Sequence, residues 1–138
     1  MKPAYIVTSV AAALIVIGVL FVAVRRRRPV KLSSDRFTER WKALQRHCVS
    51  RKTWPQAIVE ADNLLDEALK KARYKGKTTG ERLVAAQHAL TSNDTVWFGH
   101  KLRKTITSED VRKLKKNDVL EALAGFRQAL RDLGALEP

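Results

Sequence analysis

Acidic side chains gather in one predicted helix, at Glu60, Asp62, Asp66 and Glu67. Carboxylates at this density can hold a metal ion or act as general acid and base. Asp62 and Asp66 are four residues apart, so they share one face of a helix. Asp62 also borders an apolar stripe that contains Ile58, where an ion pair between helices is partly removed from water. We therefore interpret these acids as structural, with Asp62 paired to Arg103 or to Lys101.

The other side chains that commonly perform chemistry are Cys48, His47, His88 and His100. The histidines have no metal-ligand spacing among themselves or with the cysteine, so we predict no metal site. There is no Gly-rich phosphate loop and no His-Glu-x-x-His motif. Cys48 lies on an apolar stripe and is interpreted as a buried, unreactive thiol, and a single cysteine excludes an intramolecular disulfide. We expect no catalytic residue and no cofactor.

Basic side chains form two clusters outside the N-terminal region. The first comprises Lys70, Lys71, Arg73, Lys75 and Lys77. The second contains the candidate polyanion-binding residues Lys101, Arg103, Lys104, Arg112 and Lys113. Each cluster by itself is typical of a solvated surface. If the two lie on one side of the fold, they predict a site for a polyanion.

Residues 4–24 contain no charged side chain and are followed at once by Arg25, Arg26, Arg27 and Arg28. As a helix this run would be about 30 Å long, the thickness of the hydrocarbon core of a bilayer. Arginine-rich flanks stay on the cytoplasmic side and attract anionic lipid. The pattern predicts a single-pass inner-membrane protein, with residues 1–3 outside, 4–24 transmembrane, 25–34 a basic linker and 35–138 a cytoplasmic domain.

The cytoplasmic domain is predicted to be all-α, because apolar residues recur at helical spacing and no segment alternates with a period of two. Phe37, Trp41, Leu44 and Cys48 mark a first helix. Thr53 is expected to cap a second helix, which ends near Gly76, and Thr78 with Glu81 forms a capping box for a third. Further stripes span residues 98–106 and 119–133, where Gly134 ends the last helix. The fold class is therefore an N-terminal transmembrane helix followed by a small bundle of four main helices and a shorter one.

Four segments carry a resemblance to a known group of proteins. They read WPQAIVEADNLLDEAL at 54–69, YKGKTTGERL at 74–83, DTVWFGHKLRKTITSE at 94–109 and QALRDLGAL at 128–136. Together they resemble an uncharacterised family of single-pass bacterial proteins, over nearly all of residues 36–136. The resemblance implies a transmembrane helix joined to a cytoplasmic helical domain, and it brings no assigned activity.

The segment 94–109 is in turn similar to the signature of HEPN domains, which are helical bundles that often act as ribonucleases or nucleotide-binding modules. That signature is an Arg, usually followed by a polar residue such as Asn, and a His a few residues later. Arg103 stands at the Arg position, Lys104 at the Asn position and Ser108 at the His position. A serine hydroxyl has no pKa near neutrality and cannot replace imidazole as general acid or base.

We therefore predict a non-enzymatic binding module, anchored at the inner membrane surface, that engages a protein or a polyanion. Its expected partners are anionic lipid at the arginine collar, a protein, and nucleic acid as a further class. A HEPN-like RNA-binding or ribonuclease module with a degenerate site is the alternative, and a structural membrane protein is a third. The net charge of +13, of which six charges belong to residues 1–31, is compatible with each.

Overall fold

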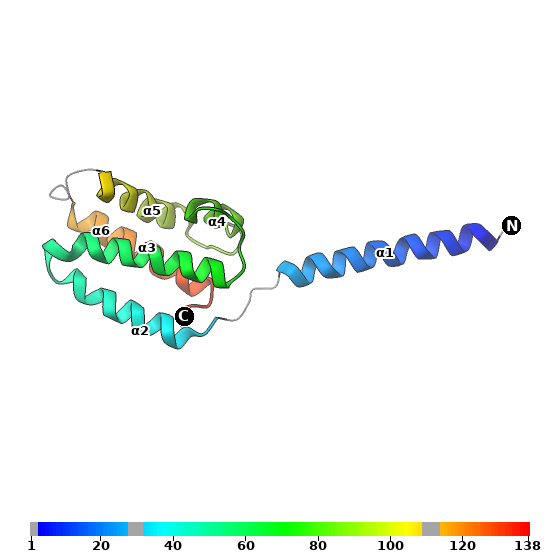
Figure 1. The fold of residues 1–138 in the computed structure, drawn as a ribbon, viewed down its shortest axis with the longest axis horizontal. Helices are drawn as coiled ribbons and strands as arrows, with labels where there is room; N and C mark the ends of the chain where they lie inside the picture. Colours follow the sequence, from blue (N-terminus) through cyan, green and yellow to red (C-terminus); the bar gives the residue numbers. More distant parts are fainter. Residues whose placement is uncertain (1–2, 28–31, 109–113) are drawn as a thin grey trace.

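All regular elements of the computed structural model are helices. The model describes residues 3–27, 32–108 and 114–138, and within them the side chains of 9–21, 32–106 and 114–138. These ranges contain no strand, so the prediction of an all-helical chain is confirmed. The elements are α1 Pro3–Arg27, α2 Ser34–Gln45, α3 Trp54–Lys71, α4 Thr79–Ala85, α5 Asn93–Ser108 and α6 Lys116–Asp132 (Figure 1).

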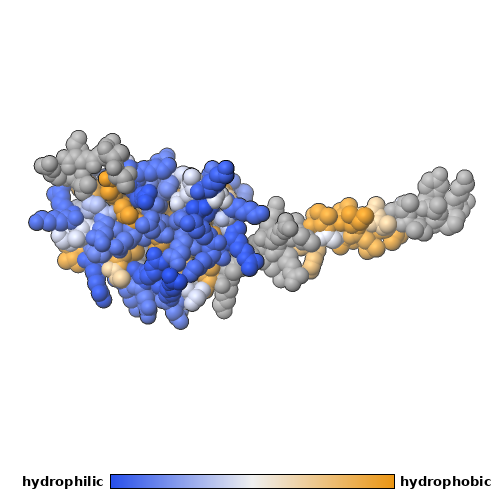
Figure 2. Space-filling model, in the orientation of Figure 1, coloured by the Kyte–Doolittle hydropathy of each residue, from blue (hydrophilic) through white to orange (hydrophobic). Residues whose placement is uncertain are grey.

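The predicted transmembrane helix over residues 4–24 is wrong. Among the described residues, no helix combines the length and the apolar character that crossing a membrane requires. The described side chains of α1 are mainly apolar and exposed (Figure 2). The membrane and single-pass assignments are corrected accordingly, and the structure does not test the predicted location and orientation.

The bundle consists of four longer helices, α2, α3, α5 and α6, together with the short α4 (Figure 1). Its core is formed by the stripes that the sequence shows, with Phe37, Leu44, Ile58, Leu65 and Phe126 at most 2% exposed. α2 ends earlier than the predicted apolar stripe from Phe37 to Cys48 suggests. Beyond Gln45 the chain continues as two short 3-10 turns, Arg46–Cys48 and Arg51–Thr53, so Cys48 lies half-buried outside α2.

The helix ends follow the predicted signals in part. Thr78 accepts a hydrogen bond from the backbone N–H of Glu81 at 3.1 Å, and Gly134 has a positive φ of 78° just after α6. Thr53 does not cap α3 with its side chain, because its hydroxyl donates to the carbonyl of His47 instead. The chain leaves α3 at Arg73 and not near Gly76, with φ of 67° and with the Tyr74 N–H bonded to the Leu69 carbonyl at 3.0 Å.

Arg73 occupies a left-handed position that usually belongs to glycine, because a Cβ atom is strained there. We expect Arg73→Gly to raise the free energy of unfolding by about 0.5–1 kcal/mol. Urea denaturation of the variant and the wild type measures this difference. Lys75→Gly serves as the control, since no positive φ is recorded at Lys75. Equal destabilisation by the two glycines would contradict the strain at Arg73.

α3 lies at the centre of the bundle and packs against α2, α4, α5 and α6. α5 and α6 form the closest pair, and two glycines permit their approach. A Cβ atom on Gly125 would lie 2.6 Å from the backbone carbonyl of Thr95, and one on Gly99 would lie 2.9 Å from the Phe126 ring. α2 and α6, in contrast, both rest on α3 and hardly touch one another.

Candidate functional site

A buried polar cluster joins α3 to α5. Asp62 Oδ1 and His100 Nδ1 are 2.8 Å apart, and the two side chains are 2% and 5% exposed. Because an ionised carboxylate only accepts hydrogen bonds, His100 donates from Nδ1. Arg103 approaches the other oxygen, with Nε 3.5 Å from Asp62 Oδ2. The structure thus brings together Asp62 and Arg103, the residues of the expected structural ion pair, and adds a histidine to them.

An imidazole held by a carboxylate at Nδ1 has the orientation of a general base, with Nε2 directed away from the acid. In this bundle the ring is enclosed. The Trp97 ring meets it edge-on at 5.8 Å between centroids, and a Cβ atom on Gly80 would lie 3.7 Å from Nε2. With 5% of its side chain exposed, His100 offers no room for a substrate. The geometry therefore favours a structural role for the cluster.

The sequence contained a signal for His100 that the search for metal ligands missed. His100 and Arg103 are three residues apart and share one face of α5, and Asp62 borders the apolar stripe of α3. Two helices that pack along these faces place a histidine and an arginine against one acid. Spacing alone did not reveal this triad, because its acid lies 38 residues away from the histidine along the chain.

Two acids of α3 hold several cations in place. Asp66 pairs with Lys70 at 3.1 Å and with Arg82 at 2.7 Å. Glu67 pairs with Arg36 at 3.5 Å, with Lys71 at 3.4 Å and with Arg40. The cations of the first cluster that lie on α3 are therefore neutralised within the bundle, and the pairs of Asp66 and Glu67 with Arg82, Arg36 and Arg40 tie α3 to α4 and α2.

These ion pairs lower the pKa values of both carboxyl groups. Burial acts to raise the pKa of Asp66, but hydrogen bonds from Arg82, Lys70 and Thr79 outweigh it, and the net direction is down. The hydrogen bond from Arg40 is the largest influence on Glu67 and lowers its pKa as well. Both groups therefore remain ionised in the folded state to a lower pH than in the unfolded chain.

A carboxyl group with a lowered folded-state pKa contributes stability above its unfolded pKa, near 4, and loses it as the pH falls through the folded value. We expect the urea midpoint to decline below about pH 4. Asp66→Asn combined with Glu67→Gln should lower the midpoint at pH 6 and make the acid decline shallower. The exposed Glu39→Gln is the control. Parallel pH curves for the double variant and the wild type would contradict this assignment.

The remaining cations of the first cluster are exposed on the connection between α3 and α4. We call residues 72–78 the cationic loop, after Arg73, Lys75 and Lys77. In the described part of the chain these three side chains make no ion pair, in contrast to Lys70 and Lys71. The loop is anchored at its end by Glu81, whose carboxylate accepts the backbone N–H of Lys77 at 2.6 Å.

The cationic loop leads into a contact with α5. Gly80, at the start of α4, would place a Cβ atom 3.6 Å from the Trp97 ring. Lys101 follows Trp97 by four residues and Lys104 by seven, so both lie on the same flank of α5. Both are exposed, whereas Arg103 is turned toward Asp62. Lys101 and Lys104 are therefore exposed cations on α5, the helix whose Trp97 contacts the start of α4.

Other predicted site residues fall outside the described ranges. These are Arg112 and Lys113 of the polyanion candidates, Arg28 of the arginine collar, and the side chains of Arg25–Arg27 and of Ser108. Their predicted roles stay predictions. Cys48 is half-buried, and burial raises the pKa of its thiol, which keeps it protonated.

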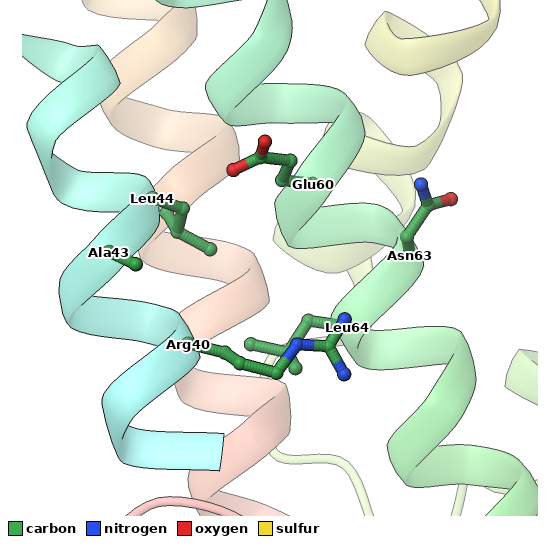
Figure 3. A pocket seen from close by; sticks show the side chains of 6 residues that line it. All are labelled: Arg40, Ala43, Leu44, Glu60, Asn63 and Leu64. Atoms are coloured by element: carbon green, nitrogen blue, oxygen red, sulfur yellow. The ribbon is translucent and has the colours of Figure 1, made fainter. Parts of the chain in front are cut away.

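Two hollows open beside α2. The smaller, about 290 Å³, lies between α2 and α3 (Figure 3), and its charged groups already have partners. Arg40 binds Glu67, and Glu60 accepts a hydrogen bond from Gln56 at 3.0 Å and lies 3.6 Å from His47. Within the described residues no group of three or more His, Cys, Asp and Glu side chains is arranged to hold a metal ion.

The larger hollow is a groove of about 420 Å³ between α2 and α6, which we call the α2–α6 groove. It is lined by Trp41, Leu44, Gln45, Cys48, Leu120, Leu123, Ala124 and Arg127. Its lining is mainly apolar, and its charged member is basic. α2 and α6 both pack against α3, and the groove lies between them where they make little contact with each other.

Comparison of the chain with protein-family models, with curated proteins and with solved structures finds no match.

Proposed function

We propose that this chain is a non-enzymatic module that binds a polyanion through the cationic loop and the adjacent flank of α5. The observation that carries the proposal is the exposure of Arg73, Lys75 and Lys77 without ion-pair partners in the described structure. Cations that are left unneutralised on one short loop can exchange counterions for phosphates. Lys101 and Lys104 extend this cationic surface along α5.

The absence of catalysis is proposed from the enclosure of the imidazole. Phosphodiester cleavage by acid–base chemistry requires a group that contacts the substrate within hydrogen-bond reach. His100 is held against Asp62 beneath Gly80 and Trp97, with 5% of its side chain exposed. A polyanion bound to the cationic loop would therefore contact basic side chains, and none of the loop's side chains would serve as a general base.

The test is fluorescence anisotropy of a labelled single-stranded RNA with the full chain over a series of salt concentrations. The variant Arg73→Gln, Lys75→Gln, Lys77→Gln removes three cations. The matched control Lys42→Gln, Lys52→Gln, Lys115→Gln removes three exposed cations from other elements. We expect the loop variant to weaken binding about tenfold or more at low salt, with a shallower salt dependence, and the control to weaken it much less.

Equal weakening by the two triple variants would show that net charge alone attracts RNA, and it would overturn the proposed site. The arginine collar is common to all of these proteins, so its contribution cancels in the comparison. Glutamine at residue 73 keeps the left-handed backbone strain, so the fold of the loop is not altered by relief of strain.

A HEPN-like ribonuclease is the second candidate function. The observation that favours it is Arg103 beside a histidine oriented by an aspartate, three groups that phosphodiester cleavage can use. The same RNA, followed on a denaturing gel, separates the two functions. We expect no cleavage. Metal-independent cleavage that disappears in both His100→Asn and Arg103→Ala would establish the second candidate and reject the first.

A further inference from the structure

The α2–α6 groove is an apolar surface that the bundle does not cover. α2 and α6 each pack on α3, yet they make little contact with one another, so the seam between them stays open. Six of the eight residues that line the groove are apolar or weakly polar: Trp41, Leu44, Cys48, Leu120, Leu123 and Ala124. A bundle of this kind can accept one more helix in the seam without rearranging its core.

One of the strongly exposed apolar side chains of the bundle lies in the groove, and another follows a lining residue in the sequence. Outside α1, the large hydrophobic side chains that are strongly exposed in the described chain are Val49 at 90%, Val84 at 54% and Leu120 at 53%. Leu120 lines the groove, and Val49 follows directly after Cys48, which also lines it. Leu120 thus adds exposed apolar surface to the apolar lining, and a contiguous exposed apolar patch is typical of a protein-binding site.

The charge within the groove lining is basic. Arg127 is its charged lining residue, and no acid contributes to the lining. On α6, Lys116 lies four residues before Leu120 and is exposed, and the acids Asp118 and Glu121 lie on the same helix outside the lining. An occupant that complements this surface carries an apolar stripe with acidic flanks.

We propose that the α2–α6 groove binds an amphipathic helix of a partner protein, with its apolar stripe between α2 and α6 and its acidic side chains toward Arg127 and Lys116. Helix-in-groove recognition uses apolar side chains three and four residues apart, which match a groove formed by two helices. The site is separate from the cationic loop, so this proposal does not rest on polyanion binding. A second copy of this chain is a less complementary occupant, because the copy would present the same basic face.

The probe is a labelled peptide of about 18 residues with Leu at helical spacing and Glu at the flanking positions. A second peptide carries Lys in place of every Glu, and a third has the composition of the first in an order that destroys the stripe. Binding to the full chain is followed by fluorescence anisotropy. We expect the acidic amphipathic peptide to bind, and both other peptides to bind at least about tenfold more weakly, or about 1.4 kcal/mol.

Three variants locate the site. Leu120→Gln, alone or combined with Ala124→Glu, makes the groove polar, and Arg127→Glu reverses its charge. Because all three side chains are exposed, the bundle should stay folded, which circular dichroism checks. Each variant should weaken binding of the acidic peptide about tenfold or more, and Arg127→Glu should strengthen binding of the basic peptide. The control Val84→Gln removes an equally exposed apolar side chain from α4 and should change nothing.

Three results would overturn the proposal: equal binding of the ordered and the scrambled peptide, equal binding of the acidic and the basic peptide, or equal effects of Val84→Gln and Leu120→Gln. Sedimentation of the full chain tests whether a second copy of the chain occupies the groove. Self-association that Leu120→Gln abolishes would assign the groove to a second copy of the chain and reject the partner helix. The triple glutamine variant of the cationic loop should still bind the acidic peptide, which keeps this test independent of RNA binding.

Discussion

Asp62→Ala is expected to destabilise the bundle by about 3–5 kcal/mol, because it removes the acid from a buried cluster and leaves Arg103 and His100 without their partner. Asp62 is 2% exposed, and Arg103 Nε is buried with no hydrogen-bond partner among the described residues. Without Asp62 the guanidinium keeps its charge in a poorly solvated place. Urea denaturation at pH 7 measures the loss, and the exposed Glu39→Ala, expected within about 0.5 kcal/mol of the wild type, is the control.

A double-mutant cycle of Asp62→Ala and Arg103→Ala separates the contribution of the arginine from that of the histidine. Arg103 is 32% exposed and 3.5 Å from the acid, so its coupling to Asp62 should be smaller than that of His100, which bonds to Asp62 at 2.8 Å and is 5% exposed. A parallel cycle with His100→Ala tests this order. Coupling near zero in both cycles, with single variants close to wild type, would show that the cluster is solvated and that His100 and Arg103 are free to act on a ligand.

Gly125→Ala is expected to lower the free energy of unfolding by about 3 kcal/mol, at the upper end of the range for overpacked cores. The melting temperature should fall by more than about 10 °C. A methyl group at this position would lie 2.6 Å from the Thr95 carbonyl, and a backbone group cannot move aside as a flexible side chain can. α5 and α6 would have to separate along the closest contact in the bundle. Thermal denaturation followed by circular dichroism gives the measurement.

Two further variants make the Gly125 prediction specific. Gly18→Ala places a methyl group where nothing lies within 4 Å, so it should leave the unfolding of the bundle unchanged. Thr95→Ser should not rescue Gly125→Ala, because the collision is with the Thr95 backbone as well as with its side chain. A rescue would show that α5 can adjust its side chains without separating from α6.

The helices themselves could be predicted from the sequence, because their signals are local. The stripes of Phe37, Trp41 and Leu44 and of Val119, Leu123 and Phe126 have helical spacing and pack against the core. Thr78 with Glu81 and the positive φ of Gly134 are likewise local. The local signals did not predict two helix ends. The Thr53 hydroxyl donates to the carbonyl of His47 and does not cap α3, and Arg73 has a positive φ at a position where glycine is usual.

The length of the uncharged segment 4–24 was not enough to predict correctly whether α1 spans a membrane. Residues 4–24 lack charge, yet among the described residues no helix is long and apolar enough to cross a membrane. The prediction rested on composition counted along the chain.

The candidate sites depended on tertiary structure. Sequence placed Asp62 at the edge of a stripe and Arg103 beside a core position, which is enough to expect them near each other. It did not show that His100 would hold the acid from the other side, since that contact exists only once α3 and α5 pack at one particular depth and rotation. The sequence also showed two basic clusters without distinguishing neutralised cations from unneutralised ones.

Packing decided that distinction. Asp66 and Glu67 take up Lys70, Lys71 and Arg82, whereas Arg73, Lys75 and Lys77 remain exposed on the connection. The α2–α6 groove is likewise a property of arrangement, because it arises where two helices share α3 and leave a seam between them. Helix formation follows from spacing along the chain, while partners, burial and unoccupied surfaces follow from which faces meet, and only the folded chain determines that.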